Sequence, residues 1–236
     1  MTRRRWIADE VSGNHAALLG DHALHLSRVL RASVGQRFDI VTSAGVRAGQ
    51  ITSVADDRVE FSLGEAITEE QIAPITLLLS VFKFDRMEWA IEKCTELGVA
   101  RIVPVIARRT ESHLATTSPK RVERWQRIAK QASEQSRRSS SPEVAMPLKL
   151  KDGVAMTATQ RIVLSETEKG AMLKDCLNAD DSGDLLLAIG PEGGWTPDEL
   201  DLFAQSGWKA ASLGPTILRA ETAAIAATTL AISTMQ

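Results

Sequence analysis

The residues best placed to do chemistry lie in a glycine-rich turn near the C-terminus. Residues 190–197 (GPEGGWTP) follow an apolar run at 185–189 and precede a helical pattern with a capping residue at Thr196. Gly193 and Gly194 permit positive φ angles and let a ligand approach the backbone closely. Ligands in open α/β sheets bind beyond the carboxyl ends of the strands, so this turn indicates a binding site, although a purely structural tight turn has the same composition. The segment matches neither the dinucleotide-binding nor the P-loop fingerprint.

Two further loops, a second glycine turn and a polar loop, also directly follow apolar segments. Gly214 follows the short apolar run 210–213, and the chain continues through Arg219 and Glu221 into a helix of small residues. The polar loop 165–170 follows another apolar run. Three loops at the ends of three strands could form one pocket that offers a cation, a carboxylate and backbone donors.

The histidines and cysteines do not have the spacing of a metal site. His22 and His25 fit one face of a helix, and Cys94 and Cys176 lie in amphipathic segments without a CxxC pattern. The sequence therefore predicts no bound metal and reduced cysteines, which favour a cytoplasmic location. It also contains no run of about eighteen apolar residues, so we expect no membrane partner.

Basic residues are concentrated in the middle of the chain. The 28 Lys and Arg and 30 Asp and Glu give a net charge of −2, but residues 83–138 carry +6 and residues 139–236 carry −6. A basic segment beside an acidic one suggests an anionic partner, with nucleic acid first among the candidates. A solvated helical surface is the equally weighted alternative.

The elements that would position these residues divide into two groups. The first seventy residues are mostly strands by their alternation, with one helix that opens at Asp21. Later, apolar strands are predicted at 75–82, 101–106, 161–164, 185–189 and 210–213, and helices from Asp85, Ser118, Gly170, Thr196 and Ala220. Alternating strands and helices predict a mainly parallel sheet covered on both faces, preceded by a small β-rich domain.

Taken together, the motifs resemble one family. The paired segments 190–194 (GPEGG) and 213–223 (LGPTILRAETA) are similar to the signature of the RsmE family of small-subunit ribosomal RNA methyltransferases. Further segments fit that family at 25–31 (HLSRVLR), 83–88 (KFDRME), 92–99 (EKCTELGV) and 134–137 (EQSR). The resemblance covers nearly the whole chain.

The resemblance implies a fold and an activity. The fold would be α/β, with a PUA-like β-barrel RNA-binding domain over residues 1–72 and a SPOUT methyltransferase domain over residues 73–236 whose C-terminal segment forms a trefoil knot. The activity would be methylation of N3 of a uridine in 16S ribosomal RNA, in the small ribosomal subunit, with S-adenosyl-L-methionine as methyl donor. The family also implies a homodimer in which the C-terminal helix, from Ala220, packs across the interface.

The chemistry of methyl transfer to uracil and the charge of the chain suggest roles for individual residues. Arg219 would stabilise negative charge on the uracil ring, and Glu221 would orient Arg219 or accept the N3 proton. Glu192 would contact the cofactor or cap the helix that begins near Thr196. The residues expected to bind the cofactor are Leu164, Ser165, Glu166, Ile189, Gly190, Pro191, Glu192, Gly193, Gly194, Leu213, Gly214, Ile217, Leu218, Arg219 and Thr222. The residues expected to contact RNA phosphates are Arg3, Arg4, Arg5, Arg28, Arg31, Lys83, Arg86, Arg137 and Arg138.

Two other classes of protein share part of this pattern. A non-catalytic RNA-binding assembly factor would need the basic segment and the β-rich domain but not both glycine turns with the Arg219 and Glu221 pair. A small-molecule transferase with the same cofactor would need the pocket alone. Tight S-adenosyl-L-methionine binding without methyl incorporation into any RNA would favour neither the RNA methyltransferase nor the assembly factor.

Overall fold

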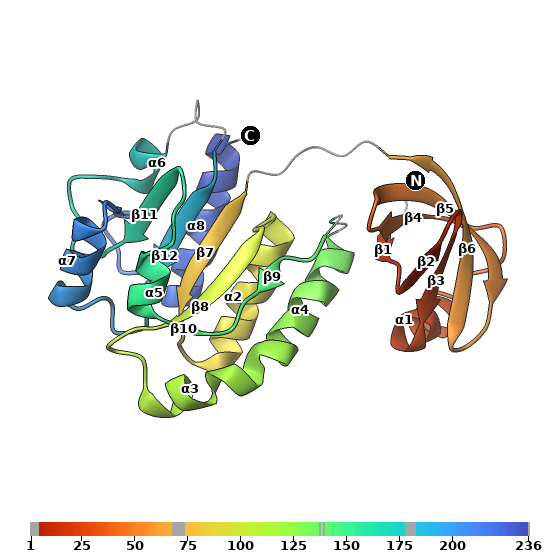
Figure 1. The fold of residues 1–236 in the computed structure, drawn as a ribbon, viewed down its shortest axis with the longest axis horizontal. Helices are drawn as coiled ribbons and strands as arrows, with labels where there is room; N and C mark the ends of the chain where they lie inside the picture. Colours follow the sequence, from red (N-terminus) through yellow and green to blue (C-terminus); the bar gives the residue numbers. More distant parts are fainter. Residues whose placement is uncertain (1–4, 68–73, 137, 139, 178–182, 236) are drawn as a thin grey trace. The chain divides into compact units, whose positions relative to one another are not determined.

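The chain folds into two compact units. The computed structural model describes residues 5–67, 74–136, 138, 140–177 and 183–235 (Figure 1). One unit comprises residues 1–71 and 133–140, and the other comprises residues 72–132 and 141–236. The domain boundary predicted after residue 72 falls within 68–73, outside the described residues.

The first unit is built on a curled six-stranded sheet. Its strands lie in the order β1-β4-β5-β6-β3-β2, and each pair is antiparallel except β1 with β4. The strands are β1 (Arg5–Ile7), β2 (Glu10–Ser12), β3 (His15–Leu19), β4 (Arg37–Thr42), β5 (Gly45–Val54) and β6 (Arg58–Ala66). The predicted helix forms as α1 (Gly20–Leu24), followed by a π-helical turn (His25–Val29). Because β1 and β2 are the two edges of this sheet, the expected barrel is an open half-barrel.

The second unit is an α/β layer structure with a parallel sheet. Its strands lie in the order β10-β8-β7-β12-β11-β13, with β9 also paired to β8, and every pair is parallel. The strands are β7 (Ile75–Ser80), β8 (Arg101–Ile106), β9 (Glu143–Val144), β10 (Leu148–Lys149), β11 (Gln160–Leu164), β12 (Leu185–Ile189) and β13 (Lys209–Ala211). The helices are α2 (Phe84–Leu97), α3 (Ser112–Thr117), α4 (Val122–Gln135), α5 (Leu150–Val154), α6 (Leu173–Cys176), α7 (Pro197–Gln205) and α8 (Ala220–Met235). The predicted α/β fold with a mainly parallel sheet is therefore confirmed.

Helices cover both faces of this sheet, as the apolar strands require. Alternate residues of β7 point to opposite faces, so Leu77 and Leu79 join one buried cluster and Leu78 joins the other. The first cluster packs against α2, α4, α6 and α8, and the second packs against α5 and α7. A parallel sheet buried on both faces explains why its strands are apolar throughout.

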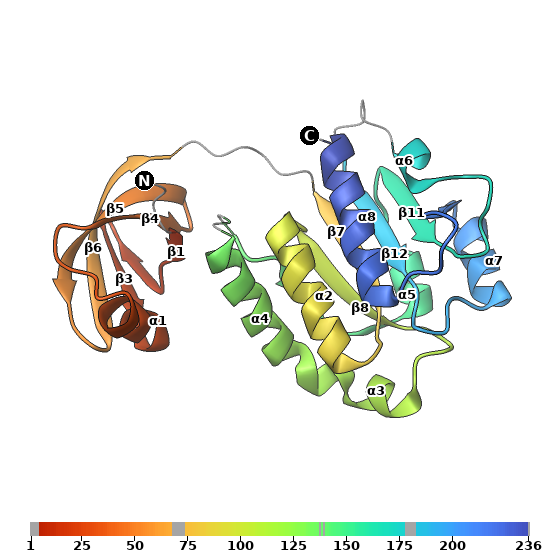
Figure 2. The same cartoon turned by 180° about the vertical axis from the view of Figure 1, so that it is seen from behind.

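Helix α8 packs closely against α2 because its buried residues are small (Figure 2). Ala224, Ala227 and Ala231 are fully buried in this contact region. The hydroxyl of Thr228 donates to the thiol sulfur of Cys94, 3.6 Å away. Burial raises the pKa of the Cys94 thiol to about 12, so this cysteine stays protonated at neutral pH.

The segment before α8 pairs with the loop after β11, more than thirty residues earlier in the chain. The backbone N–H of Ser212 donates to Ala171, and the N–H of Leu173 donates to Ser212, so this stretch pairs with the loop after β11. The same pairing holds residues 171–172 extended, and the helix predicted from Gly170 begins only at Leu173. Such pairing is compatible with the predicted trefoil knot, and the knot itself stays a prediction. No helix among the described residues is long and apolar enough to span a membrane.

Candidate active site

A pocket of about 130 Å³ lies at the carboxyl ends of β11, β12 and β13. It is formed by the three loops that the sequence singled out. Every residue expected to bind the cofactor lines this pocket except Gly193, Arg219 and Thr222. The sequence analysis did not include five further lining residues, Ser212, Pro215, Thr216, Ala220 and Ala223. Four of these five lie within the second predicted segment, 213–223, and Ser212 directly precedes it, so the family signature over that segment was the available signal.

The first glycine turn needs glycine at position 194 rather than at 193. The N–H of Gly194 donates to Pro191 over 2.8 Å, which closes the turn, and Gly194 has a φ of +69°. A Cβ atom at position 194 would lie 2.1 Å from Oε1 of Glu166, in the neighbouring loop. Gly193 has no positive φ, and a Cβ there would meet only the side chain of Arg109 at 3.2 Å. The close approach therefore occurs at Gly194.

Trp195 joins two of the pocket loops. Its side chain is buried, and its indole Nε1 donates to the carbonyl oxygen of Leu164 over 3.0 Å. The ring lies against Gly190, where a Cβ would be only 3.2 Å from Nε1. This tryptophan thus fixes the end of β12 against the end of β11.

Helix α7 begins with the predicted cap. Thr196 accepts the N–H of Glu199, and Oε2 of Glu199 accepts the N–H of Thr196 over 2.8 Å, which completes a capping box. The other oxygen of Glu199 accepts the N–H of Arg108 over 2.6 Å. Glu199 is buried, so it links the loop after β8 to the start of α7. Glu192 does not cap this helix.

Arg86 joins three elements beside the pocket. Its Nη1 makes a short ion pair with Glu192, which lines the pocket, and its Nε lies 3.8 Å from Oε1 of Glu221. The Glu221 side chain is only 4% exposed, and its Oε2 has no hydrogen-bond partner in the part of the chain that the structure describes. Arg86 was expected to contact RNA; the structure instead pairs it with these two carboxylates.

Arg219 is not paired with Glu221. It is exposed, follows the pocket-lining Leu218, and makes no side-chain hydrogen bond or ion pair with any described residue. The cation that faces Glu221 is Arg86, so the predicted orienting role of Glu221 toward Arg219 is not what the structure shows.

The third loop is held in shape by its own carboxylate. Oε1 of Glu168 accepts the N–H groups of Gly170 and Ala171 at 2.7 and 3.1 Å. These backbone hydrogen bonds lower the pKa of Glu168. The Ser165 and Thr167 hydroxyls lie 2.8 Å apart in the same loop. The loop that supplies Glu166 is therefore ordered before any ligand enters.

Comparison with known proteins identifies the family. Residues 68–232 match the family model described as an RNA methyltransferase domain. A Synechocystis protein named ribosomal RNA small subunit methyltransferase E is 36% identical over 209 residues, which are 84% of this chain and 66% of that protein. The protein of the same name from Rickettsia conorii is 31% identical, over 89% of this chain and 86% of its own length. This chain belongs to the ribosomal RNA small subunit methyltransferase E family.

Solved structures agree with this assignment. The ribosomal RNA small subunit methyltransferase E of Neisseria gonorrhoeae, bound to S-adenosyl methionine, superimposes with a TM-score of 0.83 at 29% identity. The match covers 96% of this chain and 95% of that one. A putative methyltransferase from Legionella pneumophila, in complex with the bound cofactor, gives a TM-score of 0.85 at 27% identity, over 99% of this chain and 98% of its own. The family predicted from the sequence motifs is confirmed.

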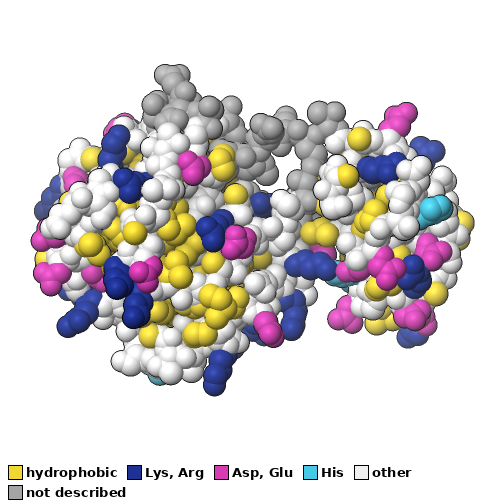
Figure 3. All heavy atoms as spheres, viewed as in Figure 1, with side chains coloured by type: hydrophobic (Ala, Val, Ile, Leu, Met, Phe, Trp, Pro, Cys, Tyr) yellow, Lys and Arg dark blue, Asp and Glu magenta, His cyan; other side chains and the backbone are white. Residues whose placement is uncertain are grey.

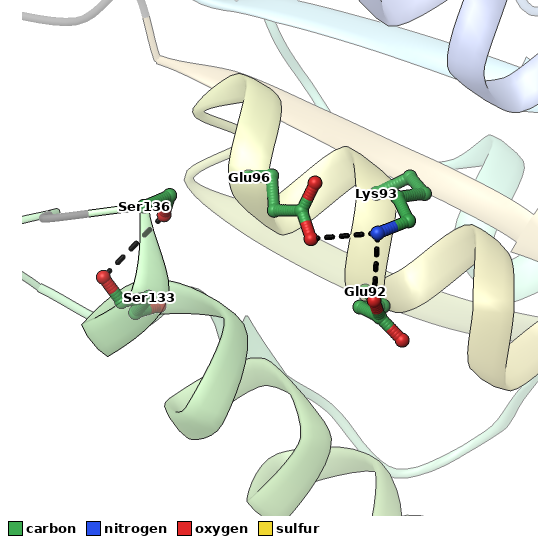
Figure 4. Close-up of polar contacts among 5 residues, drawn as sticks. All are labelled: Glu92, Lys93, Glu96, Ser133 and Ser136. Atoms are coloured by element: carbon green, nitrogen blue, oxygen red, sulfur yellow. Dashed lines mark hydrogen bonds and ion pairs between the residues drawn. The ribbon is translucent and has the colours of Figure 1, made fainter.

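One segment typical of the family lies on α2, and its residues do not line the pocket. Lys93 donates to Glu92 over 2.7 Å and to Glu96 over 2.8 Å, and these bonds raise the pKa of Lys93 (Figure 4). At the C-terminal end of α4, the hydroxyl of Ser136, just beyond the helix, donates to the carbonyl of Ser133 over 3.4 Å. Each of these contacts is local in sequence.

The residues expected to contact RNA have different surroundings. Arg3, Arg4 and Arg137 lie outside the described residues. Arg31 and Lys83 are exposed, whereas Arg5 is partly buried. Arg28 is exposed but forms an ion pair with Asp56, which raises the pKa of Arg28 and lowers that of Asp56. Arg138 is buried, and burial lowers its pKa to about 10.

Figure 3 shows one face of the molecule, on which Lys and Arg side chains are dispersed among acidic and apolar ones. Among the described residues, no group of three or more His, Cys, Asp or Glu side chains could hold a metal ion.

Proposed function

We propose that this protein transfers a methyl group from S-adenosyl-L-methionine to N3 of a uridine in 16S ribosomal RNA. The observation that carries the proposal is the single pocket in which both family motifs meet, 190–194 and 213–223. The proposed substrate is this RNA in the small ribosomal subunit, which places the reaction in the cytoplasm.

The pocket suits this cofactor. Leu164, Ile189 and Leu213 provide apolar surface for the adenine ring, and the glycine turns provide backbone groups for polar edges. Gly214 has a φ of +132°, and a Cβ there would meet no atom within 4 Å, so the pocket is open on that side. When bound, the cofactor supplies an electrophilic methyl group.

Arg219 provides for the charge that develops on the substrate. As the N3 proton leaves, negative charge spreads to the neighbouring carbonyl oxygens of uracil. An exposed arginine that follows the pocket segment and has no described side-chain partner is free to stabilise that charge. This is the role we infer for Arg219.

Glu221 is the proposed proton acceptor. A buried carboxylate oxygen that accepts no hydrogen bond is energetically unfavourable. We therefore infer that a hydrogen-bond donor of the substrate pairs with Oε2 of Glu221. Its Oε1 faces Arg86 at 3.8 Å, beyond hydrogen-bond distance. Glu221 does not line the pocket, so its buried Oε2 would accept the N3 proton only in a conformation that exposes this oxygen to the substrate.

We also infer a homodimer and an RNA-binding role for the first unit. Trp89 of α2, Ile217 before α8 and Leu230 of α8 are exposed apolar side chains in the second unit. Burial of such side chains in an interface with a second copy would remove them from water. The basic residues that are expected to contact RNA lie in both units and would bind its phosphate groups.

Mass spectrometric mapping of small-subunit ribosomal RNA tests the proposal directly. A deletion strain should lack one N3-methyluridine, and the wild-type gene should restore it. A gene with Glu221→Gln should not restore it while the protein accumulates normally. An unchanged methylation map in the deletion strain would refute the proposed activity.

A further inference from the structure

Arg109 contacts the glycine turn from outside the pocket. It lies in the loop after β8, and its Nη1 donates to the carbonyl of Gly193 over 2.6 Å and to that of Trp195 over 3.3 Å. These two carbonyls flank Gly194, the residue with the left-handed backbone. One guanidinium therefore holds the 193–194 peptide group, directly before Gly194, and the 195–196 peptide group, one residue beyond it.

The loop that carries Arg109 is itself tied to the sheet. The Thr110 hydroxyl donates to Val81, after β7, over 3.2 Å and accepts the N–H of Ala107 over 3.2 Å. The N–H of Arg108 donates to the buried Glu199 of α7. These hydrogen bonds hold the loop that carries Arg109 in place. The aliphatic part of the Arg109 side chain also lies against Gly193.

We propose that Arg109 is a positioning residue for the cofactor, which rests on the proposed function. Arg109 does not line the pocket, but one of the two peptide groups that it holds includes the lining residue Gly194. Charge-assisted hydrogen bonds are stronger than neutral ones, so they can hold these peptide groups in one orientation before the cofactor arrives. Without them, cofactor binding would have to order the turn, and affinity would fall.

Two variants of Arg109 separate its donors from its stem. Arg109→Met keeps the aliphatic contact with Gly193 and removes both hydrogen bonds, whereas Arg109→Lys keeps a positive charge and can donate at one point. We expect the Kd for S-adenosyl-L-methionine, measured by calorimetry, to rise about tenfold or more in Arg109→Met and less in Arg109→Lys. Melting temperature and the KM for RNA should stay near wild-type values, because the effect is confined to the cofactor turn.

Arg108→Ala is the matched control. It removes a neighbouring exposed arginine side chain while leaving the main-chain N–H that Glu199 accepts. We expect its Kd for the cofactor to equal that of the wild type. An equal loss in Arg108→Ala and Arg109→Met would mean that net charge, not positioning, matters, and would overturn the inference.

The outcomes for Arg109 and for the proposed function are distinct. A wild-type protein that does not bind the cofactor contradicts the proposed function. A wild-type protein that binds, with a folded Arg109→Met variant that binds equally well, overturns the role of Arg109 alone. If Arg109→Met does not fold, the cofactor affinity of a folded Arg109→Lys variant tests the role of Arg109. An affinity weaker than that of the wild type supports this role, and an unchanged affinity overturns it.

Discussion

Two features favour glycine at position 194. Its φ of +69° is unfavourable for residues with a Cβ, and a Cβ would also require the exposed Glu166 carboxylate, 2.1 Å away, to move. The left-handed conformation alone costs an alanine about 1–2 kcal/mol. The backbone conformation is therefore the main constraint at this position.

We therefore expect Gly194→Ala to weaken cofactor binding. The Kd for S-adenosyl-L-methionine in calorimetry should rise by about tenfold or more, since each 1.4 kcal/mol is a factor of ten. Gly193→Ala is the matched control, because its φ is ordinary and its only close neighbour is the flexible Arg109 side chain. Equal affinities for the two variants would remove the Gly194 turn from the binding site.

Arg219 and Glu221 should affect turnover rather than binding. In single-turnover assays at saturating RNA and cofactor, Arg219→Ala and Glu221→Gln should each lower the methylation rate by about 100-fold. Cofactor affinity should remain near that of the wild type in both variants. If Arg219→Ala instead abolishes salt-dependent RNA binding and methylates normally once saturated, Arg219 is a phosphate anchor and the catalytic role is wrong.

At the scale of elements, the side chain of Glu199 accepts several hydrogen bonds at the start of α7. Glu199 accepts the N–H of Thr196, the hydroxyl of Thr196 and the N–H of Arg108. It therefore connects the helix to its own cap and to the loop after β8, a segment 91 residues away in sequence. The capping box was predictable from spacing, but the third bond was not.

We expect the loss of the Glu199 side chain to lower the free energy of unfolding more than the loss of the Thr196 cap. Thr196→Ala should lower the free energy of unfolding by about 1 kcal/mol, the usual contribution of a cap. Glu199→Ala should lower it more, by about 2–4 kcal/mol, because it removes three hydrogen bonds, two of them from partly buried backbone N–H groups. Urea unfolding measures both, with the exposed Asp201→Ala as a control expected within about 0.5 kcal/mol of wild type. A Glu199→Ala variant no less stable than Thr196→Ala would show that the link to the β8 loop adds nothing.

At the scale of the whole molecule, paired and unpaired arginines should contribute differently to RNA affinity. Arg31 and Lys83 are exposed, whereas Arg28 is already paired with Asp56. In a plot of the logarithm of the binding constant against the logarithm of salt concentration, each lost phosphate contact reduces the slope by about 0.7–0.9. We expect that reduction for Arg31→Ala and for Lys83→Ala and a smaller one for Arg28→Ala, with cofactor affinity unchanged. Identical slopes for all three variants and the wild type would exclude these residues as phosphate ligands.

The proposed dimer makes a separate prediction about α8. Leu230 is 37% exposed and Met146, which precedes β10, is 56% exposed. If α8 lies in the interface, Leu230→Glu should produce a monomer in sedimentation velocity, because the interface would bury an uncompensated charge. Met146→Glu introduces the same charge elsewhere and should leave the dimer intact. A wild-type monomer at micromolar concentration with full activity would contradict the dimer.

The local sequence determined most of the elements and the composition of the pocket. Periodicity placed the principal strands, and the carboxyl ends of parallel strands share one edge of a sheet, so the three loops that follow β11, β12 and β13 could meet. The strand order β12-β11-β13 makes these loops neighbours. Hydrophobic periodicity did not predict the shortest elements. Strands β9 and β10 are two residues each, and helices α3 and α5 are single turns or little more. The helix predicted from Gly170 was shortened because Ser212 pairs with the chain at Ala171 and Leu173.

Only the tertiary structure decided which charges face which. Arg86 and Glu192 are 106 residues apart, and Arg109 and Gly193 are 84 apart, so no local pattern could connect them. Hydrophobic periodicity reports which face of an element is buried, whereas the partner of an exposed arginine depends on how separate elements are placed in space. The sequence therefore predicted the pocket from its loops, and the fold determined that Arg86, not Arg219, faces Glu221 and that Arg109 supports the turn from behind.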